Sequence, residues 1–335
     1  MTIEPVKSRL DNVQALRALA AILVVVLHIS GLGTKAGHDV SFMSGVDPWG
    51  NAGVDLFFVI SGFIMLHIHQ ARVRSGVCFL TNRAVRIVPL YWLVTILFVV
   101  AIAAGIMAPV DDAGPGQPWT SLLFVSQPLS GAHPLVYVGW TLEYEAFFYL
   151  CFAAAIELSR RLGLDILVPL FALVLGSILL FGVGIVAIEF LYGALLARLL
   201  VRKKFGSGAG LILMIGGILL LALSFGDGTA MEQRALLFGI PATMMVAGAV
   251  ILPQKVGSLL VNLGDASYSL YLTHLFTLAL ALAAMRPGVG WATVMTAIVL
   301  VQLFAIAVHR WIERPLGEAA RKAMLQLGDR RPLPA

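Results

Sequence analysis

Arg17 and His28 lie in one strongly apolar stretch, LRALAAILVVVLHISGLG, where ionisable side chains are unusual. An α-helix turns 100° per residue, so their spacing of eleven residues places both side chains on one face, about 16 Å apart along the axis. Ionisable groups within a membrane-spanning helix usually face a protected interior. We therefore expect one helix face to carry a cation near one membrane surface and an imidazole well inside. Each residue also has a structural explanation when it is considered alone. The Arg17 side chain could extend to the lipid headgroups, and His28 could form a hydrogen bond to a neighbouring helix.

A carboxylate at a similar depth is expected from the segment VGWTLEYEAFFYL. Glu143 and Glu145 lie about 200° apart on a helix, so they cannot both face one cavity. Entry of this helix from the outer side places Glu145 about 12 Å below that surface, close to the depth of His28. A carboxylate beside an imidazole holds it in one tautomer and raises its basicity. The alternative is a glutamate that only bonds to another helix; a lone carboxylate at the membrane centre costs about 2.5–3.5 kcal/mol, so a partner is expected either way.

Arg83 and Arg86 open another apolar stretch, NRAVRIVPLYW, and their spacing of three places them on one helical face near the inner surface. Guanidinium groups bind phosphate oxygens in pairs, so this arrangement suits a phosphate-rich ligand. The tendency of basic residues to stay on the cytoplasmic side also explains them.

Other polar side chains fall at helical spacing within apolar segments. Asp55 and Ser61 lie in NAGVDLFFVISGFIM, where Asp55 is also explained as a residue of the membrane interface. Ser267, Tyr271 and His274 in LGDASYSLYLTHLF are related as i, i+4 and i+7, which predicts a polar stripe facing inward. Hydrogen bonding between helices is an alternative role for His274.

Composition places the whole chain in a membrane. Of its 335 residues, 59% are hydrophobic and 12% are charged, whereas a soluble domain carries about 25% charged residues. Ten apolar segments are long enough to cross about 30 Å of hydrocarbon. The sequence therefore predicts an all-α integral membrane protein with about ten transmembrane helices, at 13–32, 50–68, 85–108, 137–158, 165–181, 183–201, 208–224, 235–252, 266–285 and 289–312.

The distribution of basic residues sets the predicted orientation. With the N-terminus inside, 20 of the 23 Lys and Arg residues fall on the cytoplasmic side and 3 outside, so both termini are expected in the cytoplasm. This even spread over the inner loops argues against nucleic acid as a partner, despite the net charge of +5. We expect a single membrane domain over 1–335 in the inner (cytoplasmic) membrane, with no attached soluble domain. Cys78 and Cys151 indicate neither a disulfide framework nor a metal site.

Three connections are also predicted. The proline-rich outer segment 109–136 is not expected to form a continuous helix. The segment 70–82 is expected to lie along the inner surface. The apolar run 166–197 is broken only by Gly182, Gly184 and Glu189, so the alternative to two spans at 165–181 and 183–201 is one long apolar segment.

Six segments in order resemble the membrane acyltransferase type 3 family: LDNVQALRALAAILVVVLH, GVDLFFVISGF, NRAVRIVPLYW, VGWTLEYEAFFYL, LGDASYSLYLTHLF and WIERPL. The family's first-span signature, an arginine, ten residues and a histidine, falls on Arg17 and His28. Its arginine pair falls on Arg83 and Arg86, its tryptophan-to-glutamate motif on Trp140 and Glu145, and its glycine-to-serine motif places Asp55 and Ser61.

The resemblance implies transfer of an acyl group, usually acetyl, from cytoplasmic acyl-coenzyme A to a hydroxyl of a glycan. The chain is similar to stand-alone members that act on exopolysaccharides or lipid-linked sugars. We expect His28, oriented by Glu145, to act as general base, with direct attack and a transient acyl-imidazole both open. The alternative is a transporter or proton-coupled carrier, because buried His and Glu also mark ion pathways.

Overall fold

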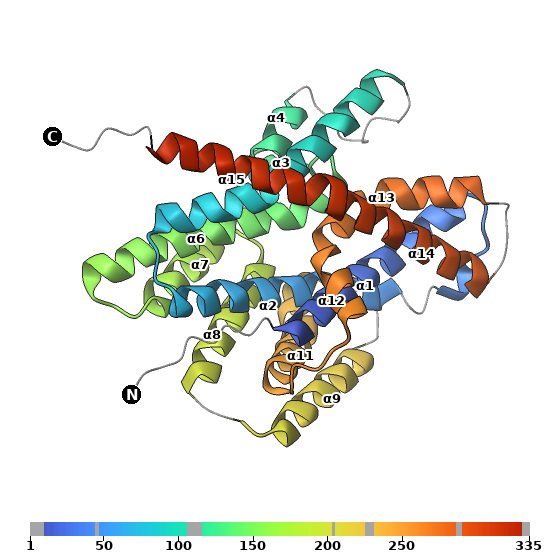
Figure 1. Cartoon of the computed structure of the whole chain (residues 1–335). Helices are drawn as coiled ribbons and strands as arrows, with labels where there is room; N and C mark the ends of the chain where they lie inside the picture. Colours follow the sequence, from blue (N-terminus) through green and yellow to red (C-terminus); the bar gives the residue numbers. More distant parts are fainter. Residues whose placement is uncertain are drawn as a thin grey trace.

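The computed structural model describes residues 10–43, 47–105, 116–202, 205–224, 231–285 and 290–329, and every regular element within these ranges is helical (Figure 1). The all-α prediction is confirmed. The helices are α1 (Asp11–Lys35), α2 (Asp47–Ala71), α3 (Gly76–Ala103), α4 (Gln117–Leu122), α5 (Ser126–Ser130), α6 (Trp140–Leu162), α7 (Leu167–Phe181), α8 (Ile188–Arg202), α9 (Ser207–Leu223), α10 (Met231–Arg234), α11 (Ile240–Ile251), α12 (Ser258–Asp265), α13 (Ser267–Ala284), α14 (Trp291–Val308) and α15 (Arg314–Asp329).

Five of the described helical segments are long and apolar enough to cross a membrane: Asp11–Lys35, Trp49–Ala71, Gly76–Ala103, Ser267–Ala284 and Trp291–Met324. Three shorter apolar helices cover Leu167–Phe181, Ser207–Leu223 and Ala235–Ile251. Large apolar side chains also face outward, as at the end of α7, where Leu179 and Phe181 are more than 80% exposed. Such exposed apolar surface suits lipid contact. Each predicted span overlaps a helix, whereas ten crossings and two cytoplasmic termini stay predictions.

The boundaries of two predicted segments can be compared directly with the helices. Gly182 has a left-handed backbone (φ +67°) and ends α7, so the predicted break between 165–181 and 183–201 is confirmed. In contrast, α3 begins at Gly76, before the predicted start at residue 85. The Ser75 hydroxyl accepts a hydrogen bond from the Cys78 amide (3.2 Å) and caps this earlier start. Only residues 72–75 therefore separate α2 from α3, instead of the expected connector 70–82.

Helix α2 lies between α1 and α8, and its contact with α8 is made by backbone atoms. A Cβ atom on Gly62 would lie 1.9 Å from the Phe190 carbonyl oxygen, and one on Gly193 would lie 2.0 Å from the Val59 carbonyl oxygen. Small residues allow such close approach in membrane proteins, where packing replaces the hydrophobic effect as the force between helices. These two glycines fix the position of α2, which carries one wall of the site.

Helix α1 is fixed at its N-terminal end. The Asn12 side-chain amide donates to the Ala249 carbonyl at the end of α11 (2.9 Å). A Cβ on Gly264 in α12 would lie 2.0 Å from the Gln14 carbonyl oxygen, so α12 also lies directly on α1. The face of α1 that bears Arg17 and His28 then meets α13.

The described part of the predicted irregular connection, 116–136, contains two short helices, α4 and α5, which agrees with the expectation of a broken segment. The Tyr91 hydroxyl and the Trp92 indole donate to the carbonyl groups of Ser121 (3.1 Å) and Leu122 (2.9 Å), respectively. These bonds hold α4 against α3. Residues 109–115 of this connection lie outside the described ranges.

Candidate active site

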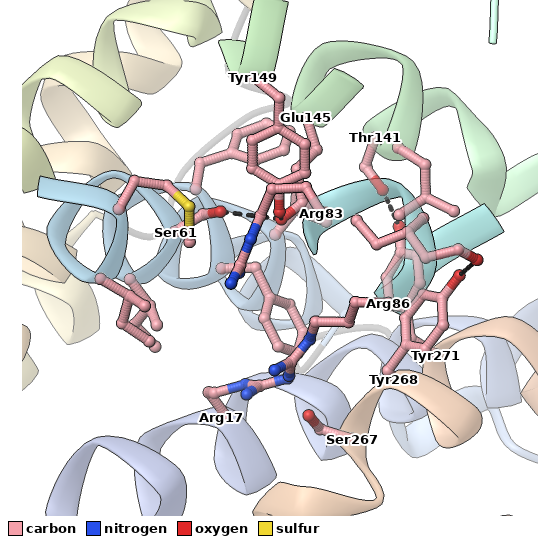
Figure 2. A pocket seen from close by; sticks show the side chains of 18 residues that line it. Arg17, Ser61, Arg83, Arg86, Thr141, Glu145, Tyr149, Ser267, Tyr268 and Tyr271 are labelled. Carbon is pink, nitrogen blue, oxygen red and sulfur yellow. Dashed lines mark hydrogen bonds between the residues drawn. The ribbon is translucent and has the colours of Figure 1, made fainter. Parts of the chain in front are cut away.

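A cavity of about 110 Å³ lies among α1, α2, α3, α6 and α13, and the three arginines singled out from the sequence line it (Figure 2). Arg17 comes from α1, and Arg83 and Arg86 come from α3. Residues separated by nearly seventy positions in the sequence thus face one space. We call it the arginine cavity.

The side chains of Arg17 and Arg86 point toward each other, and that of Arg83 points into the same space (Figure 2). Among the described residues, the three guanidiniums form one hydrogen bond, a long one from Arg17 Nη1 to Gln14 Oε1 (3.4 Å). Arg83 Nε is buried without a hydrogen-bond partner in the part of the chain that the structure describes. Within the same described part, none of the three forms an ion pair with a carboxylate. Clustered, unpaired guanidiniums fit an anionic ligand with several oxygens, such as a phosphate group.

Glu145 and Ser61 also line the arginine cavity. The Ser61 hydroxyl donates to Glu145 Oε1 (2.8 Å), and the Tyr149 hydroxyl donates to the same oxygen. The sequence reasoning did not single out Tyr149, although its i+4 spacing from Glu145 was a usable signal. Glu145 is therefore part of the polar wall around the arginines.

Glu143 has a different environment, as expected from its angle on the helix. Its carboxylate is buried and accepts hydrogen bonds from the backbone amides of Ser126 (2.7 Å) and Gln127 (2.9 Å). These amides are at the start of α5, so Glu143 anchors the α4–α5 segment to α6. The two glutamates thus face separate environments.

The structure does not bring Glu145 to His28, which was the expected pairing. His28 Nδ1 lies 3.3 Å from His274 Nε2 and 2.8 Å from the Val24 carbonyl oxygen. The two imidazole rings lie edge to face, with centroids 5.0 Å apart. The physical reason is that the register of α6 turns Glu145 toward Ser61 of α2, while α13 places His274 beside His28.

The hydrogen bonds determine which nitrogen of each ring carries the proton. A carbonyl oxygen only accepts, so His28 Nδ1, facing Val24, carries hydrogen. By the same argument His274 Nδ1 carries hydrogen, because it lies 2.8 Å from the Tyr271 carbonyl oxygen. The one hydrogen on His28 Nδ1 is then shared between the Val24 carbonyl oxygen, at the shorter distance, and His274 Nε2. In the neutral ring, Nε2 of His28 retains an unprotonated lone pair, which is the state required of a general base.

Tyr271 is close to both the arginine cavity and His274. It lines the cavity, and its ring centroid is 6.1 Å from that of His274. Its hydroxyl shares a hydrogen bond with the Thr141 hydroxyl (2.6 Å) and donates to the Val138 carbonyl (3.0 Å). Ser267 and His274 are fully buried and Tyr271 is nearly so, which confirms the predicted inward-facing stripe of α13.

Asp55 and Trp140 do not line the arginine cavity. Asp55 is fully buried and forms a two-point ion pair with Arg234 of α10 (Nε to Oδ1 3.0 Å, Nη2 to Oδ2 2.9 Å). Sequence reasoning gave no partner for Asp55, since the two residues are 179 positions apart. The Trp140 ring packs edge to face against Phe58, with centroids 6.4 Å apart. Both residues act in the packing of the surrounding helices.

Comparison with known proteins identifies the class of this helical site. The family profile described as "Acyltransferase domain" matches residues 10–310. The chain therefore belongs to the membrane acyltransferase type 3 family, and it is an integral membrane acyltransferase.

Two relatives match most of the chain. It is 34% identical to "Exopolysaccharide production protein ExoZ" of Rhizobium meliloti (strain 1021), over 88% of this chain and 96% of that protein. It is 25% identical to "Acyltransferase MdmB" of Streptomyces mycarofaciens, over 97% of this chain and 94% of that protein. No solved structure matches the chain.

Proposed function

We propose that this protein transfers an acyl group, acetyl by the family's usual chemistry, from acyl-coenzyme A to a hydroxyl of an exopolysaccharide or of its lipid-linked precursor. The observation that carries the proposal is the arrangement along α1, whose one face presents Arg17 to the arginine cavity and His28 to His274. The likeness to a protein named for exopolysaccharide production supports this acceptor class. Family membership favours the acyltransferase over the carrier alternative.

The arginine cavity is the proposed donor site. Coenzyme A carries a diphosphate between its nucleotide and its thiol arm, and Arg17, Arg83 and Arg86 offer unpaired donors for those oxygens. Placement of these arginines toward the cytoplasm agrees with the predicted inner-membrane topology and with the supply of acyl-coenzyme A in that compartment.

The proposed chemical step uses the free nitrogen of His28. Nε2 accepts the proton of the acceptor hydroxyl while the hydroxyl oxygen attacks the thioester carbonyl carbon. The carbon–sulfur bond then breaks, and the proton passes to the leaving thiolate, so that an ester and free coenzyme A are formed. A transient acyl-imidazole on the same nitrogen is the alternative order of events.

The proposed roles of Glu145 and Tyr271 follow from their positions in the wall of the arginine cavity. Glu145, held by Ser61 and Tyr149, supplies one negative charge to the wall of a cavity that carries three guanidiniums. Tyr271 lines this cavity, and its ring is also close to that of His274. We therefore propose that the thioester arm passes Tyr271 to reach His28.

The test compares envelope glycans by mass spectrometry from cells that lack the protein and cells that express wild type or His28→Ala. We expect the loss of one acyl unit per modified sugar without the protein, its restoration by wild type, and no restoration by His28→Ala. Isotope-labelled acetyl-coenzyme A added to membrane vesicles should label the same glycan. Identical glycan masses in all strains, or glycan movement without acyl-coenzyme A consumption, would contradict the proposal.

A further inference from the structure

A second, smaller cavity, of about 20 Å³, lies where α2 ends and α3 begins. Its polar lining residues are His69, Arg72, Arg74, Asn82 and Arg83. No carboxylate is among the described residues that line it. We call it the connector cavity, because Arg72 and Arg74 belong to the short segment 72–75 between the two helices.

The two cavities are adjacent, since Met65 and Arg83 line both. Arg83 therefore lies between the cluster formed by Arg17 and Arg86 and the cluster formed by Arg72 and Arg74. A ligand that extends from the arginine cavity past Arg83 meets a second lining that contains arginines and no carboxylate, which favours a second anionic group on that ligand.

The non-helical backbone of the connector explains why its arginines are available. Arg72 and Arg74 follow the last turn of α2, and neither forms an ion pair with a carboxylate within the described ranges. Glu157, an acidic side chain near this connector, is already used: it accepts from the Gly76 amide (2.8 Å) and pairs with Arg160 (3.0 Å). The charges of Arg72 and Arg74 are thus left for a ligand.

Given the proposed acyl-coenzyme A donor, on which this step rests, the chemistry of the ligand identifies the second group. Coenzyme A carries a phosphate monoester on the ribose, at the end remote from the thioester. We propose that Arg72 and Arg74 bind this 3′-phosphate in the connector cavity, while Arg17, Arg83 and Arg86 bind the diphosphate. The distance between the two arginine clusters then matches the distance between the diphosphate and the 3′-phosphate. This match favours binding of coenzyme A thioesters over shorter pantetheine thioesters, which lack the 3′-phosphate.

The test measures binding of coenzyme A and of 3′-dephospho-coenzyme A to the full chain in nanodiscs by calorimetry. Wild type is expected to bind coenzyme A about tenfold or more tightly than the dephospho form, which is the effect of one charge-assisted contact. The variant Arg72→Gln/Arg74→Gln is expected to bind both ligands with the affinity of wild type for 3′-dephospho-coenzyme A. Retained binding of that ligand also shows that the variant is folded.

The matched control is Arg161→Gln, which removes an exposed arginine from the end of α6, outside both cavities, and should keep the full preference. The proposal is overturned if wild type binds coenzyme A and 3′-dephospho-coenzyme A with equal affinity. It is also overturned if the double variant still prefers coenzyme A. An equal loss of affinity for the two ligands would be such a case, and would indicate that the two arginines bind a lipid phosphate instead. If the double variant binds neither ligand, the single variants decide, since each must reduce the preference. If wild type binds both ligands with equal affinity, the 3′-phosphate site is wrong but the proposed function is not contradicted. If wild type binds neither ligand, the proposed acyl-coenzyme A donor is contradicted as well.

Discussion

His274 Nε2 lies 3.3 Å from His28 Nδ1, and each imidazole also contacts a backbone carbonyl of its own helix. The second contact matters because the Val24 carbonyl keeps hydrogen on Nδ1 of His28 even if His274 is removed. In the proposed mechanism His274 is therefore a positioning residue, and the lone pair that accepts the proton is on Nε2 of His28.

Replacing the two histidines should give unequal losses. His28→Ala removes the proposed base, so transfer should fall about 10²- to 10⁴-fold. His274→Ala should cost less, since the tautomer of His28 is kept. Transfer of the labelled acyl group from acetyl-coenzyme A in membrane vesicles measures the activity of both variants. His133 is exposed, and His133→Ala is the control that should retain activity. A larger loss for His274→Ala than for His28→Ala would reverse the assignment.

The arginine cavity predicts a loss of donor affinity with little effect on folding. Arg83→Ala should weaken coenzyme A binding by about 10- to 100-fold, the effect of one charge-assisted hydrogen-bonding group. Arg83→Lys keeps the charge and loses the planar fork, so its affinity should be intermediate. Calorimetry over a series of salt concentrations checks the order of the three proteins. Equal affinity for all three would show that Arg83 does not contact the donor.

Asp55 and Arg234 should behave as one buried unit. Asp55→Asn leaves the buried guanidinium of Arg234 without its paired carboxylate, which should lower the free energy of unfolding by about 3–5 kcal/mol. Arg234→Gln should cost a similar amount, and the double variant should cost less than the sum. A double-mutant cycle from chemical unfolding in detergent measures this coupling. Strict additivity would contradict the pair as a cooperative element.

The α2–α8 contact predicts a strong dependence on side-chain size. Gly62→Ala places a Cβ 1.9 Å from the Phe190 carbonyl oxygen, so the helices must separate, at a cost of about 1–3 kcal/mol or more. Gly31→Ala in α1 is the matched control because a Cβ there meets nothing within 4 Å. It should leave stability unchanged or raise it by up to about 1 kcal/mol. Thermal unfolding of both variants tests the difference; equal melting temperatures would mean that α2 and α8 are not in close contact.

Periodicity and charge were sufficient to predict a helix in each of the ten apolar segments, and the residues of α1, α3 and α13 that share one interior, because helical spacing fixes direction within a single helix. The helices α12 and α15, which lie outside those segments, were not predicted. Depth alone suggested that Glu145 meets His28, and that pairing was not found, since equal depth does not fix the rotation of one helix relative to another. The contact between Asp55 and Arg234 joins segments far apart in sequence, which no local pattern encodes. The side-chain partners on neighbouring helices could therefore be identified only from the packed structure.

The glycine contact between α2 and α8 has a mechanical consequence. Side chains adjust by rotamer changes, but backbone atoms in direct contact cannot, so α2 and α8 form one rigid body. Ser61 and its wall of the arginine cavity belong to that body. Backbone contact also joins α1 to α2, since a Cβ on Gly53 would lie 2.4 Å from the Ala20 carbonyl oxygen. We therefore expect any widening of the arginine cavity to come from movement of α3, α6 and α13.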